Sequence, residues 1–426
     1  DNQLSISGAG DKVSYLISGA FTGQSGFIKN DDFKRKSLRV NLESQAAEWL
    51  KVGLQSFGSF VNKDGSEPNI STIIQQSPLI EPYDAEGNLI INPFETNFSS
   101  PFLNYYVDDY ERHNYFFANL YGVVDFPFLK GLSYRINFGN NYRINEHDYA
   151  SQYAENQKGR AYKDLDNYYD YTLDNILSYS KTFDKHNISA TLLYGAIERK
   201  FSSTLADATI FDRISLGYNG LEQGSVQETF SDAWRESLNY QMFRVNYKLN
   251  ERYLFTGTVR RDGFSGFADN HKFAYFPSAA LGWVISSEPF FSPSWVDYLK
   301  LRVGYGLSGN QTSRYSSLAR LSSGASYVFG DGGSTLFGQQ LQTLANPNLR
   351  WEKTKGLNIG LDFTFLENRL SGALEYYYNR TNDLLYDIQL PYLSGIASIR
   401  SNIGELQNKG LELSLNSKNI TGKNFQ

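Results

Sequence analysis

The segment Gly304–Gly309 is the residue pattern in this chain most suggestive of chemistry. It matches G-x-G-x-x-G, the glycine pattern of dinucleotide-binding loops. That loop binds a pyrophosphate only where its glycines follow a strand and open a helix. Here the glycines lie inside an alternating run whose apolar members are Val303, Tyr305 and Leu307. The context therefore predicts a strand with small residues on one face, where another group can approach the backbone closely.

Metal and catalytic patterns are equally sparse. The chain has no cysteine, which excludes disulfides, cysteine-ligated zinc and thiol nucleophiles. Its four histidines lack the close spacing of a zinc site, and no G-x-S-x-G element occurs. Asp108, Asp109 and Glu111 form an acidic group without the repeat of a calcium loop, so a solvated loop is the better interpretation. We expect no catalytic residue, no cofactor and no metal, and therefore no enzyme.

Composition favours β-structure. Of 426 residues, 31 are Tyr, 30 are Phe and 36 are Gly, with a single Met, which suits half-buried strands that carry amphipathic rings. A net charge of −5 gives no basic field for nucleic acid. No run approaches the roughly 18 apolar residues of a membrane helix. The opening residues Asp1–Leu4 have no signal-peptide character, and we expect the chain to begin inside a longer protein.

Apolar residues recur at every second position. Leu357, Ile359, Leu361 and Phe363 alternate with polar or small residues, and many other segments repeat this pattern. The clearest of these are 37–43, 243–249, 299–308 and 411–416. We expect Leu357, Ile359, Leu361 and Phe363 to point outward, with Asn358, Gly360 and Asp362 on the other face. Alternation alone fits a soluble sandwich as well.

Strand length and link length separate the two cases. The alternating segments run for about 10 to 14 residues, whereas globular strands centre on about 5 or 6 and membrane-crossing strands need about 9 to 11. Short links also alternate with long polar ones, as in outer-membrane barrels. The short links lie near 8–12, 45–49, 127–131, 183–186, 249–252 and 366–369. The long ones lie near 22–36, 61–112, 144–169, 199–235, 310–350 and 382–402.

This layout predicts an all-β fold, an antiparallel transmembrane β-barrel with about fifteen strands between Leu4 and Leu415. Residues 113–126, 236–249 and 351–365 should run inward, and 132–143, 253–262 and 369–381 should run back out. Aromatic residues near strand ends should form interfacial girdles. They are Trp49, Tyr253, Trp295 and Tyr298 on the short-link side, and Tyr142 and Trp351 on the long-link side.

Several motifs resemble the SusC/RagA family of TonB-dependent transporters from the Gram-negative outer membrane. The most specific is Arg260-Arg261-Asp262-Gly263-Phe264, which continues to Phe276-Pro277-Ser278 and Gly282-Trp283. Others are Asn346-Pro347-Asn348-Leu349-Arg350-Trp351-Glu352 and Asn402-Ile403-Gly404-Glu405-Leu406. The resemblance spans essentially the whole chain. It departs mildly near Phe264 and Gly266, where the family favours Ser and Arg.

The resemblance implies a plugged transporter with 22 strands. Residues 1–426 would then be one part of a single barrel domain, an internal fragment without the plug domain or TonB box. The implied function is TonB-dependent active import of an oligosaccharide or oligopeptide across the outer membrane. The implied partners are a SusD-like lipoprotein lid, TonB of the inner-membrane complex, and outer-membrane lipid.

Two alternatives stay open from the sequence. A passive outer-membrane porin would close with about 16 to 18 strands and need no plug. A soluble all-β carbohydrate-binding protein would have shorter strands and no asymmetry of link length. For the importer, we expect cargo contacts in the long links, because aromatic rings there can stack on sugars or bury peptide side chains, so they suit either cargo. The candidate residues are Tyr105, Tyr106, Asp108, Asp109 and Trp234.

Overall fold

The computed structural model describes residues 1–27, 30, 32–66, 73–74, 77–93, 99–154, 158–330 and 333–419. Within these ranges, no helix is both long enough and apolar enough to cross a membrane. The named elements of the described residues are mostly strands, and the others are short 3-10 helices.

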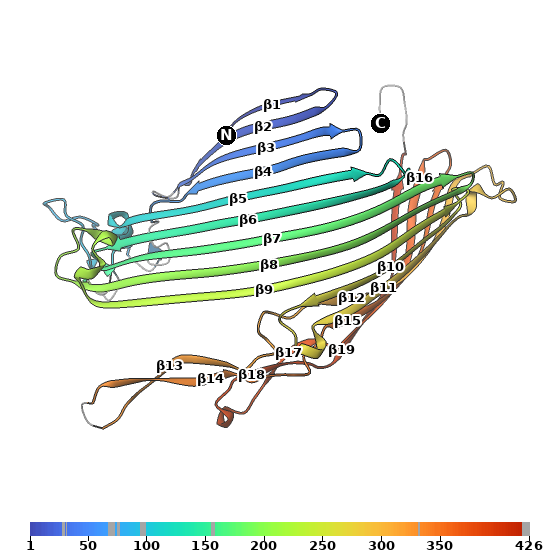
Figure 1. Ribbon diagram of the computed structural model, residues 1–426. Helices are drawn as coiled ribbons and strands as arrows, with labels where there is room; N and C mark the ends of the chain where they lie inside the picture. Colours follow the sequence, from blue (N-terminus) through green and yellow to red (C-terminus); the bar gives the residue numbers. More distant parts are fainter. Residues whose placement is uncertain are drawn as a thin grey trace. The chain divides into compact units, whose positions relative to one another are not determined.

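Fifteen strands of the described chain form one antiparallel sheet (Figure 1). Their order is β1 to β12 in sequence, followed by β15, β16 and β19. The first nine are β1 (Asn2–Ala9), β2 (Val13–Ser25), β3 (Asp32–Ala47), β4 (Leu50–Asn62), β5 (Asp108–Asp125), β6 (Leu132–Ser151), β7 (Arg160–Phe183), β8 (His186–Phe211) and β9 (Gly224–Leu249). The remaining six are β10 (Tyr253–Phe264), β11 (Phe273–Val284), β12 (Val296–Asn310), β15 (Glu352–Phe365), β16 (Leu370–Asn382) and β19 (Glu405–Ser417).

The sheet confirms the predicted meander of about fifteen strands. The segments predicted to run in opposite directions are strands, and β9–β10 and β15–β16 are antiparallel neighbours. The link between β9 and β10 shows how such a hairpin is closed. Asn250 and Glu251 have φ values of 54° and 59°, and Arg252 N donates to Leu249 O at 3.0 Å. Two successive residues with positive φ match the twist of the flanking strands.

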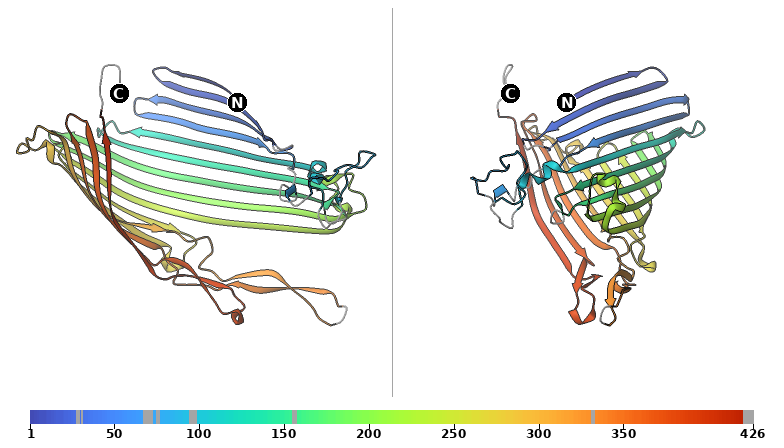
Figure 2. Two further views of the ribbon diagram at one scale, coloured as in Figure 1. Left: turned by 180° about the vertical axis from the view of Figure 1, so that it is seen from behind. Right: turned by 90° about the vertical axis from the view of Figure 1, so that its left-hand side faces the viewer.

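Two small hairpins and several 3-10 helices lie outside the large sheet. β13 (Arg320–Val328) pairs with β14 (Thr335–Thr343) in an arm beyond β12 and β15, and β17 (Leu385–Gln389) pairs with β18 (Ser398–Asn402) (Figure 2). Among the described residues, the 3-10 helices are η2 (Pro101–Tyr106), η3 (Gly217–Asn219), η4 (Leu221–Gln223), η5 (Asp269–His271), η6 (Ile285–Ser287) and η7 (Tyr392–Ser394).

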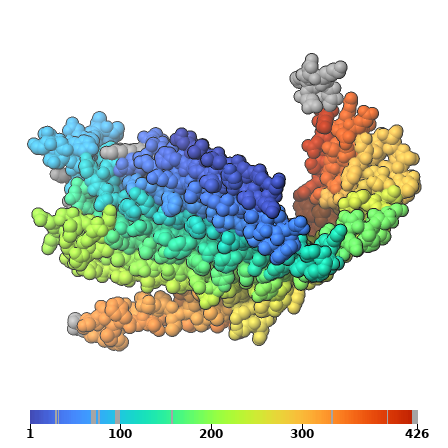
Figure 3. All heavy atoms as spheres, turned by 45° about the horizontal axis from the view of Figure 1, so that its top comes forward, coloured from blue at the N-terminus to red at the C-terminus, as the bar shows by residue number. Residues whose placement is uncertain are grey.

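The chain divides into two compact units. Unit 1 comprises Asp1–Gly122, Asn137–Leu173 and Glu198–Arg235, and unit 2 comprises Val123–Ile136, Asp174–Ile197 and Glu236–Gln426. Strands β5 to β9 contribute residues to both. In unit 1, strands β1 to β4 present one continuous surface of side chains (Figure 3).

Each unit has one apolar face and one polar face. In unit 1, Leu38 is 51% exposed and Phe116 is 51% exposed on the apolar face, although both are large hydrophobic residues. In unit 2, Ile359 of β15 is exposed, whereas Asn358 and Asp362 of the same strand face the other way and hydrogen-bond with Glu375 and Arg302, respectively, on the polar face. An exposed apolar sheet face of this extent is what a membrane-crossing sheet presents to lipid.

On the polar face, long side chains cross glycines to reach carboxylates two strands away. Tyr240 of β9 lies over Gly195 of β8 and donates to Asp174 Oδ1 of β7 at 2.5 Å. In unit 1, Tyr121 of β5 likewise lies over Gly53 and donates to Glu43 Oε2 at 2.6 Å. A glycine under each ring leaves the space that a Cβ would occupy, which explains glycine in a strand interior.

Arg302 of β12 also crosses a glycine, in this case with its guanidinium group. Its Nε donates to Asp362 Oδ2 at 2.7 Å, and its Nη2 donates to Glu375 Oε1 at 2.6 Å. A Cβ at Gly360 would lie 2.9 Å from the guanidinium carbon, so glycine lets Arg302 cross β15. The polar face of unit 2 therefore carries an ordered charged network rather than loosely solvated side chains.

The prediction of strand lengths and loops was wrong in part. The ranges 144–169 and 199–235 were expected to be loops, but β6, β7, β8 and β9 extend through much of them, and β8 and β9 each have 26 residues. Within the range 22–36, β2 extends to Ser25 and β3 begins at Asp32. The prediction took the polar composition of these ranges as a sign of loops. A sheet that continues beyond the lipid can be polar on both faces, because water solvates either side.

The prediction that Trp351 is an interfacial girdle residue was wrong. Trp351 is 5% exposed and packs at 4.9 Å, between ring centroids, from Phe267 in a core with Phe264, Phe276 and Leu349. Its indole N–H donates to Lys272 O at 3.0 Å. The other predicted girdle residues are exposed, with values from 37% for Tyr298 to 56% for Trp295. Trp351 instead anchors the long 311–351 link onto the β10–β11 hairpin.

Candidate functional site

Tyr105 and Tyr106 lie at the end of η2, before β5. Ser100 caps this helix by accepting a hydrogen bond from Phe102 N at 3.3 Å, and Pro101 occupies its first turn. Tyr106 is 48% exposed and meets Tyr153 edge to face, with ring centroids 6.3 Å apart. A hydrogen bond with Tyr83 raises the pKa of the Tyr106 phenol. Tyr106 therefore belongs to a group of tyrosines at the long-link end of unit 1, whereas Tyr105 packs on Phe102 of the same helix, with ring centroids 5.6 Å apart.

A recess of about 570 Å³ adjoins this group. Such a volume falls within the range of ligand pockets. Its lining combines cations, one carboxylate, an aromatic ring and apolar side chains. The lining residues are Ile91, Gln152, Tyr153, Lys158, Gly159, Phe211, Asp212, Arg213, Ile214 and Ser215. The recess suits a ligand with both polar groups and flat apolar faces.

Gly159 lies in the wall of the recess, where the backbone of the β6–β7 link hydrogen-bonds to the end of β8. Its φ is +82°, and a Cβ there would lie 3.3 Å from Ile214 Cδ1. Ile210 N donates to Gly159 O at 3.1 Å, and Phe211 N donates to Lys158 O at 2.7 Å. These backbone bonds tie the β6–β7 link to the end of β8. Lys158 and Gly159 are thus held against the end of β8 at one side of the recess.

Asp109 belongs to a second group at the outer ends of β5, β6 and β7. His147 Nε2 lies 3.0 Å from Asp109 Oδ1, and this hydrogen bond raises the pKa of the imidazole. The Tyr162 hydroxyl lies 3.3 Å from His147 Nδ1, and burial raises the pKa of Tyr162 to about 12. Asp108 is exposed at the start of β5, next to the site of Gly217. Successive residues of a strand point to opposite faces, which separates the two aspartates.

Trp234 belongs to a third group. It stacks on Phe201 with ring centroids 5.5 Å apart and planes 24° apart. Phe201 contacts Tyr168 at 4.6 Å, and Arg143 lies 3.8 Å from the centre of the Tyr168 ring. These four side chains form a row across β6, β7, β8 and β9 in unit 1. The structure thus keeps Tyr105 and Tyr106 on one short helix, but places Asp109 and Trp234 in separate groups.

The recess residues Tyr153, Lys158 and Arg213 were missed from the sequence. They lie in the long polar ranges 144–169 and 199–235, which marked the region but not the residues. Which links meet in space depends on strand ends that run well beyond the predicted ones. No group of three metal-type ligands occurs in the part of the chain that the structure describes. The recess offers binding contacts, and we identify no nucleophile–base pair in it.

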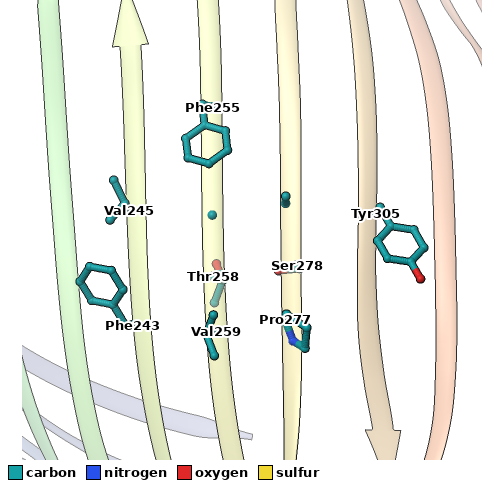
Figure 4. Close-up of a pocket in the computed structure, with 10 residues that line it drawn as sticks. Phe243, Val245, Phe255, Thr258, Val259, Pro277, Ser278 and Tyr305 are labelled. Atoms are coloured by element: carbon teal, nitrogen blue, oxygen red, sulfur yellow. The ribbon is translucent and has the colours of Figure 1, made fainter.

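Two further recesses lie on the sheet of unit 2. One of about 410 Å³ is on the apolar face, where Phe243, Val245, Phe255 and Tyr305 line it from β9, β10 and β12 (Figure 4). This position suits lipid hydrocarbon rather than a polar cargo. The other, of about 460 Å³, follows Gly304, Gly306 and Gly356. The glycine pattern met in the sequence therefore belongs to a strand and borders a hollow, with no helix after it.

Comparison with known proteins identifies relatives along the whole chain. TonB-dependent receptor P3 of Formosa agariphila is 34% identical over 100% of the chain and 44% of its own length. TonB-dependent receptor SusC of Bacteroides thetaiotaomicron is 29% identical over 100% of the chain and 45% of its own length. The chain thus spans less than half the length of these relatives.

Solved structures give the same fold. The RagAB peptide transporter superposes with a TM-score of 0.83 at 24% identity, covering 99% of this chain and 48% of that one. The ferripyoverdine receptor of Pseudomonas aeruginosa superposes with a TM-score of 0.55 at 12% identity. The predicted resemblance to SusC and RagA is confirmed, as is an outer-membrane location. Residues 53–426 match the family model described as TonB dependent receptor-like, beta-barrel, and the chain belongs to that family.

Proposed function

We propose that this chain forms part of the wall and the outer vestibule of an importer that takes up a nutrient across the outer membrane with energy from TonB. The observation that carries this proposal is the fifteen-stranded antiparallel sheet with an exposed apolar face and an ordered polar face. The family supports TonB dependence, because its relatives are named TonB-dependent receptors.

The polar face supports a plugged rather than an open lumen. Arg302, Asp362 and Glu375 form a fixed charged network there, and the hollow at Gly304 and Gly306 leaves room for a closely packed segment. A barrel of this class is wide enough to leak without a plug. We therefore propose that a plug of the complete protein fills the lumen and that TonB displaces it.

For the cargo, we propose an oligosaccharide or oligopeptide that enters past the recess of unit 1. Tyr106 and Tyr153 supply ring faces and edges, while Lys158, Asp212 and Arg213 supply charged contacts. By the resemblance to SusC and RagA, a SusD-like lipoprotein is the proposed lid over the vestibule. The chain itself has no proposed enzymatic role.

Uptake by the complete protein tests this function. A Gram-negative host lacking its own uptake system would express the complete protein, with its paired lipoprotein, and receive fluorescent oligosaccharides or oligopeptides of graded length. Uptake of one class should require TonB and the proton-motive force of the inner membrane. Uptake that persists without TonB, together with an open-channel conductance in planar bilayers, would assign the chain to a passive porin.

A variant pair tests the recess separately. Lys158→Ala with Arg213→Ala should weaken cargo uptake at low cargo concentration and leave TonB dependence intact. Lys130→Ala is the control, because Lys130 is an exposed cation in the short β5–β6 link, away from the long links. Equal uptake by the double variant and the control would remove the recess from the cargo path.

A further inference from the structure

Two cations at the outer part of β8 and β9 share one buried carboxylate. Lys200 Nζ lies 2.9 Å from Glu198 Oε1, and Arg235 Nη2 donates to Glu198 Oε2 at 2.6 Å. The Glu198 side chain is 10% exposed, whereas those of Lys200 and Arg235 are 50% and 62% exposed. The carboxylate is thus covered and the two cations lie outermost. With two positive charges and one negative charge, the group has a net charge of +1.

This group lies on the apolar face of the sheet. The Tyr171 hydroxyl lies 3.4 Å from Glu198 Oε2, and the Tyr171 ring lies 6.3 Å from that of Phe138. Phe138 is exposed on the apolar face, in alternation with polar neighbours on β6. The chain of contacts from Phe138 through Tyr171 to Glu198 places all of them on one side of unit 1. Lys200 follows Glu198 by two positions and shares its face.

A belt of tyrosines marks the level of the group. Tyr142 is exposed, packs 6.4 Å from Tyr169 and donates a hydrogen bond to Asn167 Oδ1 at 3.4 Å. Tyr142, Tyr169 and Tyr171 thus direct their rings to the apolar face and carry polar hydroxyls. Tyrosines placed in this way sit at the headgroup level of a membrane. The Tyr171–Glu198 contact sets the two cations at that same level.

The next residues along each strand face the other way. Phe201 and Trp234 stack with one another and form the row with Tyr168, in which Arg143 also lies. Each flanks Lys200 or Arg235 directly in sequence, so the two cations point away from that row. They also lie apart from the residues that line the recess. Lys200 and Arg235 are therefore exposed toward the membrane surface rather than toward the proposed cargo path.

We propose that Lys200 and Arg235, each held by one oxygen of the Glu198 carboxylate, bind the phosphate of an outer-leaflet glycolipid headgroup. A guanidinium and an ammonium at one anion supply charge-assisted hydrogen bonds, which are the strong ones, and basic groups at headgroup level select anionic lipids. The buried Glu198 fixes the spacing of the two cations before the lipid arrives. The inference depends on the outer-membrane orientation of the proposed function, with long links at the cell surface, and not on the identity of the cargo.

Lipid binding to the purified complete protein tests this site. The probes are monophosphorylated lipid A, the same lipid without its phosphate, and inorganic phosphate alone, each measured in detergent by native mass spectrometry. The wild-type protein should retain the phosphorylated lipid about tenfold more strongly than the dephosphorylated one. Lys200→Gln with Arg235→Gln should abolish that preference.

Arg244→Gln is the matched control. Arg244 lies on β9, as Arg235 does, but it alternates with the apolar-face residues Phe243 and Val245 and therefore points to the polar face. It should keep the preference for the phosphorylated lipid. Equal binding of the two lipids, or an unchanged preference in the double variant, would overturn the proposal. Binding of inorganic phosphate as strong as that of the lipid would assign the site to a soluble anion instead. TonB-dependent uptake by the double variant should persist, so a failure here is distinct from a failure of the proposed function.

Discussion

Tyr240, Tyr121 and Arg302 each cross a glycine to reach a carboxylate two strands away. In the sequence these glycines lie in alternating segments, and the pattern indicates only that a small residue stands at each position. The sequence does not show which side chain crosses which glycine. The crossing side chain, the glycine and the carboxylate lie on three different strands, and only the register of the sheet brings them together. Glycine costs strand stability by itself, and the side chain that covers it restores packing.

Gly195→Ala should therefore destabilise the protein by about 1 to 3 kcal/mol, the usual cost of overpacking. A Cβ at this position would overlap the Tyr240 ring and break its hydrogen bond to Asp174. Gly19→Ala is the control, because the nearest neighbour of a Cβ at this position would be Ser37 O at 4.0 Å. Urea unfolding of the complete protein in detergent measures both. Similar losses for the two variants would show that glycine at 195 is not required by Tyr240.

The His147–Asp109 pair gives a pH dependence. The hydrogen bond to Asp109 raises the pKa of His147 above its ordinary value. A raised folded-state pKa means that the pair stabilises the fold fully below the unfolded-state pKa of about 6.5, and that this contribution is lost as pH rises through the folded-state pKa. Thermal unfolding from pH 5 to pH 9 should show the decline. Asp109→Asn should flatten it, and an unchanged profile would exclude His147 as its source.

At the scale of strands, the sequence predicted the number of strands in the large sheet and the places of its short links. Leu249–Arg252 and Phe365–Leu370 bound tight turns as expected. It misjudged the outer ends of β6 to β9, because the apolar alternation that identifies a strand depends on lipid on one side. Beyond the lipid the strands continue with polar residues on both faces. The recess at those ends was unpredictable for the same reason.

The register of β15 allows a direct test of the lipid-facing side. Ile359→Arg should cost roughly 2 to 4 kcal/mol of stability if the residue lies at mid-bilayer, since lipid does not solvate a guanidinium. Asn358→Arg should cost far less, because Asn358 lies on the polar face beside Glu375. Folding titrations of the complete protein into lipid vesicles give both values. Equal costs would contradict the assigned faces.

At the scale of the molecule, β1 and β19 are the two edge strands of the sheet among the described residues. Backbone N–H and C=O groups left unpaired in hydrocarbon cost several kcal/mol each. Leu4 and Leu411 on these strands are 72% and 73% exposed. A membrane-embedded sheet with such edges is stable only where other strands continue it. The family and the relatives of more than twice this length support that continuation within one barrel.

A density map of the complete protein in a lipid nanodisc tests this claim most directly. We expect β1 and β19 each to hydrogen-bond to a further strand of the same protein, and a plug to fill the lumen against the polar face that carries Arg302 and Glu375. Direct pairing of β1 with β19 around an empty lumen would contradict it and favour a passive porin.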